Sequence, residues 1–298
     1  MGCWAIGGHG WGDVHDKDSI GAIQYAFDAG CTFFDTADVY GLGHSENVLR
    51  QALKDKISRT VIATKGGVRW DESGRTWRDC SPEYLEEALD ESRRRLGLDV
   101  IPLYYVHWLD GVTPVSAVIE TMARFREKGK IKALGVSNFS REQLLEAVQM
   151  TRVDAIQVRF NMLDRDHALS ILPVCRQYGI TPVFYGVLAD GLLTGKFSAT
   201  TKFGTDDNRS RSQDFQGERF LNNLRIVEAI RSTEAAKKVS IGQIALRWVL
   251  EEIECAAVLF GAKTTDQMEE NLYAEQISLS ESDHRFISDL HTSLWRSL

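Results

Sequence analysis

The sequence alternates from end to end between short apolar runs and longer segments with helical spacing. The short runs are rich in β-branched and aromatic residues, which is typical of buried parallel strands. The longer segments repeat apolar residues every three or four positions, which is typical of helices packed on a sheet. The expected strands are 3–6, 31–34, 59–64, 100–106, 131–136, 155–158, 180–184 and 256–260. The expected helices are 19–29, 45–53, 81–96, 114–128, 141–150, 166–178, 220–238, 241–251, 266–274 and 281–290.

This alternation predicts an α/β fold, a single (β/α)8 TIM barrel that spans residues 1–298 as one domain. A chain of 298 residues is within the usual range for such a barrel. We expect a long loop after the seventh strand, over 189–217, because that segment is rich in Gly, Ser, Thr, Asp and Arg. The segment 281–290 predicts a C-terminal helix.

Two other α/β architectures are disfavoured by their motifs. An open doubly wound sheet binds its cofactor through Gly-x-Gly-x-x-Gly after the first strand. The glycines at positions 7, 8, 10 and 12 do not have that spacing. A short-chain dehydrogenase needs Tyr-x-x-x-Lys, and none of the 8 tyrosines has a lysine four residues later.

The charge balance limits the classes of partner. The chain has 35 basic and 42 acidic residues, a net charge of -7, so we expect no nucleic-acid partner and no general attraction to anionic membranes. No apolar run approaches the roughly 18 residues of a membrane span. The N-terminus lacks the basic start and apolar stretch of a signal peptide. We therefore expect no membrane partner and a cytoplasmic location.

Cysteine usage agrees with that location. The 5 cysteines are widely spaced and form no Cys-x-x-Cys pair, which is typical of a reducing compartment without a disulfide framework. The sequence also has no His-Glu-x-x-His motif or carboxylate ligand cluster, so we expect no metal site. The cysteines are Cys3, Cys31, Cys80, Cys175 and Cys255.

Four side chains with acid–base chemistry follow the ends of neighbouring expected strands. Asp35 and Tyr40 follow the second strand, Lys65 follows the third, and His107 follows the fourth. Taken alone, each residue also fits a structural role, such as a cap, a packing ring or a solvated lysine. Because the carboxyl ends of barrel strands meet at one face, we expect the four to lie together, and their joint pattern favours a catalytic site.

These residue types suit the reduction of a carbonyl group by a nicotinamide, which needs an acid to protonate the carbonyl oxygen. Tyr40 suits that role, but a free phenol with a pKa near 10 is a slow proton donor at neutral pH. We expect the Lys65 ammonium to lower the pKa of Tyr40, and Asp35 to pair with Lys65 and hold it. His107 is expected to donate a hydrogen bond that orients the substrate oxygen.

With these residues in this order, the chain resembles the aldo-keto reductases, NADPH-dependent (β/α)8 barrels with an Asp, Tyr, Lys and His tetrad. The resemblance covers essentially the whole chain. It implies that Asp35, Tyr40, Lys65 and His107 are that tetrad and that the cofactor is NADP(H).

The resemblance also implies how the nicotinamide is held. Ser137, Asn138 and Gln157 match the family's nicotinamide positions in order, and their side chains can hold the carboxamide. Tyr185 offers an aromatic face on which the nicotinamide ring can stack. Individually, each of these residues also fits a capping or packing role.

Two further stretches resemble the family's phosphate-binding segments. The stretch 261–271 resembles the adenosine-phosphate motif, where backbone amides and a helix N-terminus suit a phosphate. There Lys263 is expected to favour the 2′-phosphate of NADPH over NADH. The stretch 188–196 resembles the loop that closes over the pyrophosphate. The cofactor residues implied in and beside these stretches are Gly186, Leu188, Gly191, Leu193, Lys196, Gly261, Lys263, Thr264, Gln267, Glu270 and Asn271.

The chain departs from the family pattern at three places. Phe260 and Leu109 stand where proline is common, and Gly186-Val187 replaces the usual Ser-Pro after the stacking tyrosine. The replacement of Ser-Pro by Gly186-Val187 is expected to alter the binding of the cofactor's ribose and pyrophosphate. The chain also begins at the first expected strand, without the preceding segment of many members, and we expect the barrel floor to be more exposed.

The substrate pocket is expected to have aromatic walls that suit an apolar or ring-bearing carbonyl compound. The expected walls are Trp11, Trp70, Trp77, Trp108 and the 203–216 loop. In that loop, Arg209 and Arg211 are candidates to meet the cofactor or an anionic substrate, although the sequence favours a solvated state for loop arginines.

The expected function is the reversible, NADPH-dependent reduction of a small aldehyde or ketone to the alcohol. The competing hypothesis is a regulatory barrel that resembles potassium-channel β subunits, which would bind NADPH but turn over carbonyls slowly or not at all. A third hypothesis is a pathway enzyme that acts on a sugar, a steroid or another natural product. The sequence leaves the substrate and the oligomeric state open.

Overall fold

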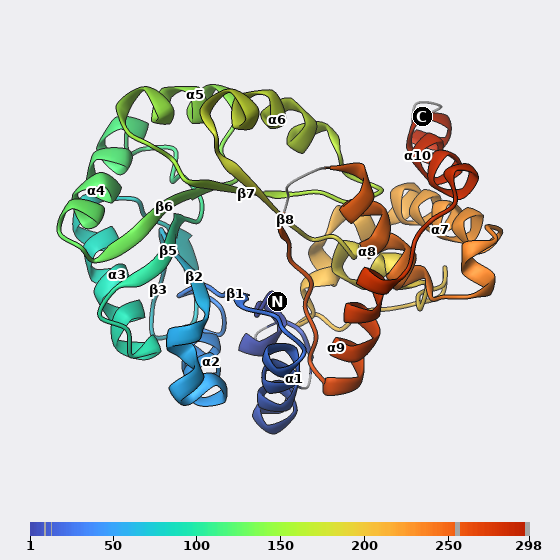
Figure 1. Cartoon of the computed structure of the whole chain (residues 1–298), viewed down its shortest axis with the longest axis horizontal. Helices are drawn as coiled ribbons and strands as arrows, with labels where there is room; N and C mark the ends of the chain where they lie inside the picture. Colours follow the sequence, from blue (N-terminus) through green and yellow to red (C-terminus); the bar gives the residue numbers. More distant parts are fainter. Residues whose placement is uncertain (9, 13, 254–256, 296–298) are drawn as a thin grey trace.

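A curled parallel sheet with helices around it forms the frame of the computed structural model, which describes residues 1–8, 10–12, 14–253 and 257–295 (Figure 1). Its 7 strands follow one another in chain order, and every neighbouring pair is parallel. The strands are β1 (Phe33–Asp35), β2 (Val61–Gly66), β5 (Ile101–Val106), β6 (Ile131–Ser137), β7 (Ala155–Arg159), β8 (Thr181–Tyr185) and β9 (Ala257–Val258).

The first residues of the chain close this sheet into a barrel. Gly2 forms parallel bridges with Asp35 on one side and with Gly261 on the other. The Cys3 amide donates to the Asp35 carbonyl at 2.8 Å, and the Gly2 amide donates to the Phe260 carbonyl at 2.9 Å. The predicted (β/α)8 barrel is therefore confirmed, with its first strand reduced to this bridge.

The strand expected over 3–6 is wrong in its position. Ala5–Gly7 forms a 3-10 turn, η1, that packs against the turn after β1. A Cβ at Gly7 would lie only 2.6 Å from the Gly41 amide nitrogen, so the two turns touch through backbone alone. The last strand is also shorter than the expected 256–260, and residue 256 lies outside the described residues.

The helices follow the expected alternation and surround the sheet (Figure 1). Capping explains several boundaries: Ser81 accepts a hydrogen bond at the start of α3, where Pro82 takes the first helical position, and Gly179 ends α6 in the left-handed conformation. The helices are α1 (Asp16–Asp28), α2 (His44–Leu53), α3 (Pro82–Leu96), α4 (Val115–Glu127), α5 (Arg141–Met150), α6 (Asp166–Tyr178), α7 (Gly217–Arg231), α8 (Ile241–Glu252), α9 (Thr265–Leu272) and α10 (Glu281–Trp295).

Three expected segments differ from the structure. The helix expected over 220–238 ends at Arg231, and a separate 3-10 turn, η6 (Ala235–Lys237), follows it. The helix expected over 266–274 ends at Leu272 and continues as a 3-10 turn, η7 (Tyr273–Gln276). The loop over 189–217 contains three 3-10 turns: η3 (Ala189–Thr194), η4 (Asn208–Arg211) and η5 (Gln213–Phe215).

Residues 68–78, which belong to none of the expected strands and helices, form an antiparallel hairpin. Its strands are β3 (Val68–Trp70) and β4 (Thr76–Arg78). The Asp71 carboxylate closes the turn by accepting hydrogen bonds from the Ser73 and Arg75 amides. Charged residues on both strands hide the β pattern in the sequence.

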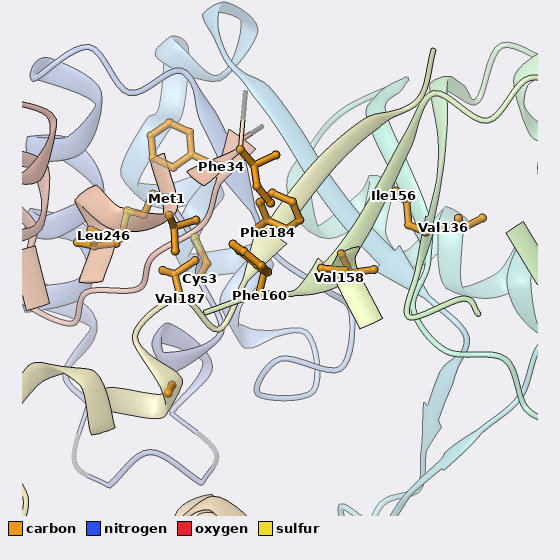
Figure 2. Close-up of a cluster of buried hydrophobic side chains, with 14 of the residues drawn as sticks. Met1, Cys3, Phe34, Val136, Ile156, Val158, Phe160, Phe184, Val187 and Leu246 are labelled. Atoms are coloured by element: carbon orange, nitrogen blue, oxygen red, sulfur yellow. The ribbon is translucent and has the colours of Figure 1, made fainter. Parts of the chain in front are cut away.

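Alternation along each strand separates two hydrophobic layers. One set of side chains belongs to the main hydrophobic core together with residues of the helices. It includes Phe34, Val136, Ile156, Val158 and Phe184, which are drawn in Figure 2. The other set fills the barrel interior with Ala63, Leu103, Tyr105, Ala155, Val183 and Leu259.

Continuing this alternation to the carboxyl ends of the strands predicts which polar side chains face the barrel interior. Lys65 lies two residues after Ala63, and His107 lies two residues after Tyr105. Gln157 lies two residues after Ala155, and Tyr185 two residues after Val183. The strand period therefore brings distant polar residues to one end of the barrel.

No helix in the described part of the chain combines the length and apolar character needed to cross a membrane. The described cysteines, Cys3, Cys31, Cys80 and Cys175, are free thiols. Cys255 lies outside the described residues.

Candidate active site

A buried lysine is the centre of the polar cluster. Lys65 is fully buried, and its ammonium donates to Asp35 Oδ1 at 2.6 Å and to the Thr36 carbonyl at 2.7 Å. A third, longer contact of 3.3 Å joins it to the Tyr40 hydroxyl. An ammonium in a dry site needs such partners, because an isolated buried charge is costly.

Asp35 has a partner for each carboxylate oxygen. Oδ1 pairs with Lys65, and Oδ2 accepts a hydrogen bond of 2.7 Å from the Gln157 side-chain amide. Gln157 was predicted to hold the nicotinamide carboxamide; in the structure it lines the cavity, and its side-chain nitrogen donates to Asp35. Asp35 thereby links β1, β2 and β7 across the barrel interior.

Tyr40 lies in the turn between β1 and α2, where its amide donates to the Ala37 carbonyl. Burial raises the pKa of Tyr40 well above its usual range, and the negative charge of Asp35 adds to this effect. The prediction of a lowered pKa is wrong for this structure, because burial and the charge of Asp35 raise the net pKa despite the Lys65 ammonium 3.3 Å from the hydroxyl. The phenol is therefore held in its protonated form.

His107 completes the cluster at the end of β5. Its ring centroid lies 5.7 Å from that of Tyr40, with the two planes at 80°. Burial lowers the pKa of His107 well below its usual range, and the positive charges of Lys65 and Arg78 act in the same direction. The imidazole is therefore neutral at pH 7, and its Nδ1 has no hydrogen-bond partner among the described residues.

A cavity of about 510 Å³ lies beside this cluster. It runs from Asp35 and Tyr40, past Tyr185, to the loop before α9. Of the predicted site residues, its walls contain Asp35, Tyr40, Gln157, Tyr185, Gly186, Leu188, Gly191, Lys196, Gly261, Lys263, Gln267, Glu270, Asn271 and Trp11.

Ser137 and Asn138, predicted to hold the nicotinamide carboxamide, are not among the residues that line the cavity. Ser137 Oγ donates to the Gln157 carbonyl at 3.1 Å, and Asn138 Nδ2 donates to the His107 carbonyl at 3.2 Å. The Tyr185 hydroxyl donates to Asn138 Oδ1 at 2.7 Å. In this structure the two side chains therefore hold His107, Gln157 and Tyr185 in place.

Two residues of the predicted phosphate-binding segments are also not part of the cavity wall. Leu193 is completely buried in the hydrophobic core, so it supports the η3 turn from beneath. Thr264 caps α9 by accepting a hydrogen bond from the Gln267 amide. The Lys263 amide donates to the Gln267 side chain at 2.8 Å, which fixes the start of this helix.

Three cations converge on one end of the cavity. Lys196, Arg209 and Lys263 all contribute to its wall. Burial lowers the pKa of Lys196, and the charges of Arg209 and Lys263 lower it further. Asp207 is paired with Arg209, with Nε 2.8 Å from Oδ1. A group of three cations around one carboxylate fits a strongly anionic ligand.

An ion-pair cluster beside this wall could not be found from the sequence. Arg159 at the end of β7 pairs with Asp214 at 2.7 Å and reaches Asp190 at 3.6 Å. Gly186 makes room for it: a Cβ there would lie 3.2 Å from Arg159 Cγ, and its φ of +66° is left-handed. No local sequence pattern indicates this cluster, because its members are far apart in the chain and come together only in the folded structure.

The predicted aromatic pocket is only partly assembled. Trp4, which the sequence reading missed, lines the cavity with Trp11, and its ring stacks 6.1 Å from Tyr40 at 29°. Its place was hidden because residues 3–6 have the pattern of a strand. Trp70 and Trp77 lie instead on the β3–β4 hairpin, and Trp108 lies under the Arg78 side chain.

The two loop arginines differ in their surroundings. Arg209 is largely buried between its Asp207 partner and the rings of Phe197 and Phe203. Arg211 is exposed, and its guanidinium makes a 3.4 Å contact with the Thr205 carbonyl. Arg209 therefore contributes to the cavity, and Arg211 is a surface residue.

Several known proteins resemble this chain over most of its length. A model of the Aldo/keto reductase family matches residues 1–291. The NADH-specific methylglyoxal reductase of Escherichia coli is 32% identical over 312 residues, which cover 99% of this chain and 95% of that protein. The aldo-keto reductase yakc of Schizosaccharomyces pombe, whose name specifies NADP(+), is 32% identical over 278 residues, with 91% and 82% covered. The structure of a glycerol dehydrogenase from Gluconobacter oxydans matches with a TM-score of 0.88 at 33% identity, covering 99% of this chain and 91% of that one.

Proposed function

The chain belongs to the aldo/keto reductase family, and we propose that it is an oxidoreductase that uses NADP(H) to reduce a small aldehyde or ketone to the alcohol. The reverse oxidation of the alcohol uses the same groups. The observation that carries this proposal is the Lys65 ammonium, which contacts both the Asp35 carboxylate and the Tyr40 hydroxyl beside a cavity.

In this proposal the reduced nicotinamide, when bound, supplies the hydride, and the protein supplies the proton. Tyr40 gives its hydroxyl proton to the carbonyl oxygen as negative charge develops there. Its raised pKa keeps that proton in place at neutral pH. Lys65, 3.3 Å from the Tyr40 oxygen, stabilises the phenolate that remains, and Asp35 holds the lysine.

His107 has an orienting role in this proposal. The neutral imidazole retains one N–H, and its ring faces the edge of Tyr40. A neutral donor can bind the carbonyl oxygen without competing with Tyr40 for the proton transfer. Trp4 stacks beside Tyr40 and excludes water from one side of the reacting group.

The residues of the cavity fit a dinucleotide along its length. Tyr185 offers a ring for stacking at the reacting end, and Lys196, Arg209 and Lys263 suit phosphates at the other end. The two relatives differ in the cofactor that their names specify, so the choice rests on this chain's own residues. Lys263 supports NADP(H), because its ammonium suits the additional 2′-phosphate.

Cofactor binding and turnover together test the proposal. Trp4 and Trp11 line the cavity, so quenching of tryptophan fluorescence should follow the titration of purified protein with NADPH or NADH. The same protein should then consume NADPH with members of a panel of aromatic aldehydes, ketones and sugars. Binding with turnover is expected. Tight binding without turnover would favour a regulatory barrel, and no binding of either nucleotide would contradict the proposal.

A further inference from the structure

The β3–β4 hairpin lies against the loop that follows His107. The Cys80 thiol donates to the Trp108 carbonyl at 3.0 Å, and the Cys80 amide donates to Asp110 Oδ2 at 2.8 Å. The hairpin follows β2 and the loop follows β5, so both lie at the carboxyl ends of the strands, with the candidate catalytic residues. The hairpin side chains are therefore available to a substrate that extends out of the barrel.

Arg78, on β4, is held over the residue next to His107. Its guanidinium carbon lies 4.5 Å from the centre of the Trp108 ring, and Nη1 makes a long 3.5 Å contact with the Leu109 carbonyl. The positive charge is close enough to contribute to the lowered pKa of His107. Stacking on an indole fixes the plane of the guanidinium while its N–H groups stay accessible.

The carboxylates next to Arg78 are bound to other groups. Asp79 accepts hydrogen bonds from Ser81 and from Arg69. Asp110 accepts from the amides of Cys80, Val112 and Thr113 and from the Thr113 hydroxyl.

The other arginines of the hairpin differ from Arg78 in this respect. Arg69 pairs with Asp79 at 3.2 Å, and Arg75 pairs with Asp71 at 3.5 Å. Within the described ranges, Arg78 has no carboxylate within ion-pair distance, although its side chain is exposed. A fixed, unneutralised guanidinium near the candidate reaction centre is suited to a carboxylate of a ligand.

We propose that Arg78 determines substrate specificity by binding a carboxylate on the far end of the carbonyl substrate. This inference rests on the proposed function and names the substrate class of the same site: aldehydes or ketones that carry a carboxylate at a distance from the carbonyl group. Arg78 is not part of the cavity wall, so it meets a substituent that extends past His107 and Trp108.

Two aldehydes of similar shape test this inference. 4-Carboxybenzaldehyde carries a negative charge opposite its aldehyde, and 4-nitrobenzaldehyde is neutral. We expect Arg78→Gln to lower kcat/KM for the carboxylated aldehyde about tenfold, because one charge-assisted hydrogen-bond pair is lost. For the neutral nitro compound, kcat/KM should change less than about twofold. Added KCl should weaken the preference of the wild-type protein for the anion.

Two further variants separate charge from packing. Arg78→Lys keeps the charge but loses the planar fork, so its preference should lie between those of wild type and Arg78→Gln. Arg75→Gln removes an arginine of the same hairpin that already has a carboxylate partner, and should leave the preference unchanged. An equal loss for both aldehydes in Arg78→Gln would overturn the proposal and leave Arg78 with only a packing role on Trp108.

A binding measurement makes the test independent of turnover. 4-Carboxybenzyl alcohol and 4-nitrobenzyl alcohol should be titrated into the protein, with and without NADP+, by isothermal calorimetry. The carboxylated alcohol should bind about tenfold more weakly to Arg78→Gln than to wild type. Affinity that does not depend on Arg78 contradicts the inference even if the protein turns over neither aldehyde. A charge-dependent affinity without turnover would retain the anion site and reject the reductase function.

Discussion

The strand-end cluster and the loop rim of the cavity are built by different means. Lys65 and His107 continue the inward face of β2 and β5, so backbone pairing between strands determines their positions. The rim over 186–216 has 3-10 turns and two non-glycine residues, Ala189 and Asp190, at positive φ. It is connected by long-range ion pairs such as Arg159–Asp214. We therefore expect changes in the cluster to alter chemistry, and changes in the rim to alter cofactor affinity.

Lys65→Met should have the largest effect. It removes the cation that stabilises a Tyr40 phenolate, and we expect kcat to fall about 1000-fold, within the range of general acid–base catalysis. It also leaves Asp35 buried without its cation, which should cost about 3–5 kcal/mol of unfolding free energy. Steady-state kinetics and urea denaturation measure the two effects.

The double variant Asp35→Asn/Lys65→Met is the matched control for this prediction. Removing both charges should restore much of the stability but none of the rate, because Tyr40 still lacks its cation. A single variant that keeps kcat within tenfold of wild type would contradict a catalytic role for the cluster.

Lys263→Met tests the opposite wall of the cavity, the loop before α9. Loss of the Lys263 ammonium should weaken NADPH binding about tenfold, as expected for the removal of one charged hydrogen-bond partner of a phosphate. NADH affinity and kcat at saturating NADPH should change less than about twofold, because neither depends on the 2′-phosphate. Fluorescence titration measures both Kd values, and Lys202→Met, at an exposed lysine of the same charge, is the control. An equal loss for NADH and NADPH would contradict the assignment.

Gly186→Ser tests whether Arg159 needs the space that glycine leaves. Gly179 is the control, because both glycines have φ +66° but a Cβ at Gly179 meets nothing within 4 Å. We expect Gly179→Ser to lose about 1 kcal/mol of stability from the left-handed backbone alone. Gly186→Ser should lose more and weaken NADPH binding a few-fold. Equal urea midpoints for the two variants would show that the contact between Arg159 and a side chain at position 186 does not change the free energy of unfolding.

Asp110→Asn should have the smallest effect, confined to stability. The pKa of Asp110 is lowered from 3.8 to about 2. Partial burial raises this pKa, but the carboxylate accepts hydrogen bonds from the Thr113 hydroxyl and from the amides of Cys80, Thr113 and Val112, and these outweigh it. Its ionised form therefore stabilises the fold above pH 4, and that stabilisation is lost as the pH falls toward 2. After allowance for solvent screening, we expect about 1 kcal/mol at pH 7. Urea unfolding at pH 7 and pH 3 measures it, and a difference from wild type that stays constant between these pH values would contradict this origin.

The barrel and the meeting of Asp35, Lys65 and His107 could be predicted because strand periodicity is local. Alternation along a strand predicts which of its side chains face the barrel interior, and this prediction does not depend on the loop conformations. The catalytic roles of these residues stay predictions. The predicted direction of the Tyr40 pKa shift was wrong because burial, with the charge of Asp35, raises this pKa, and only the structure shows how deeply the phenol is buried.

Contacts between distant segments could not be predicted. The Arg159 ion pairs join residues from β7, η3 and η5, and no local pattern signals them. The short apolar run over residues 3–6 was interpreted as a strand, which hid the approach of Trp4 to Tyr40. The hairpin that carries Arg78 was hidden by charged residues, which are unusual in buried strands but common in exposed ones.

The most direct test of the central claim is the comparison of Tyr40→Phe with wild type in both NADPH affinity and kcat. The variant keeps the ring that stacks near Trp4 and removes only the hydroxyl that contacts Lys65. The account predicts that Kd for NADPH changes less than about twofold, while kcat falls by about 100-fold or more, the range of a lost general acid. A variant that keeps wild-type kcat would contradict the proposal that Tyr40 gives the proton.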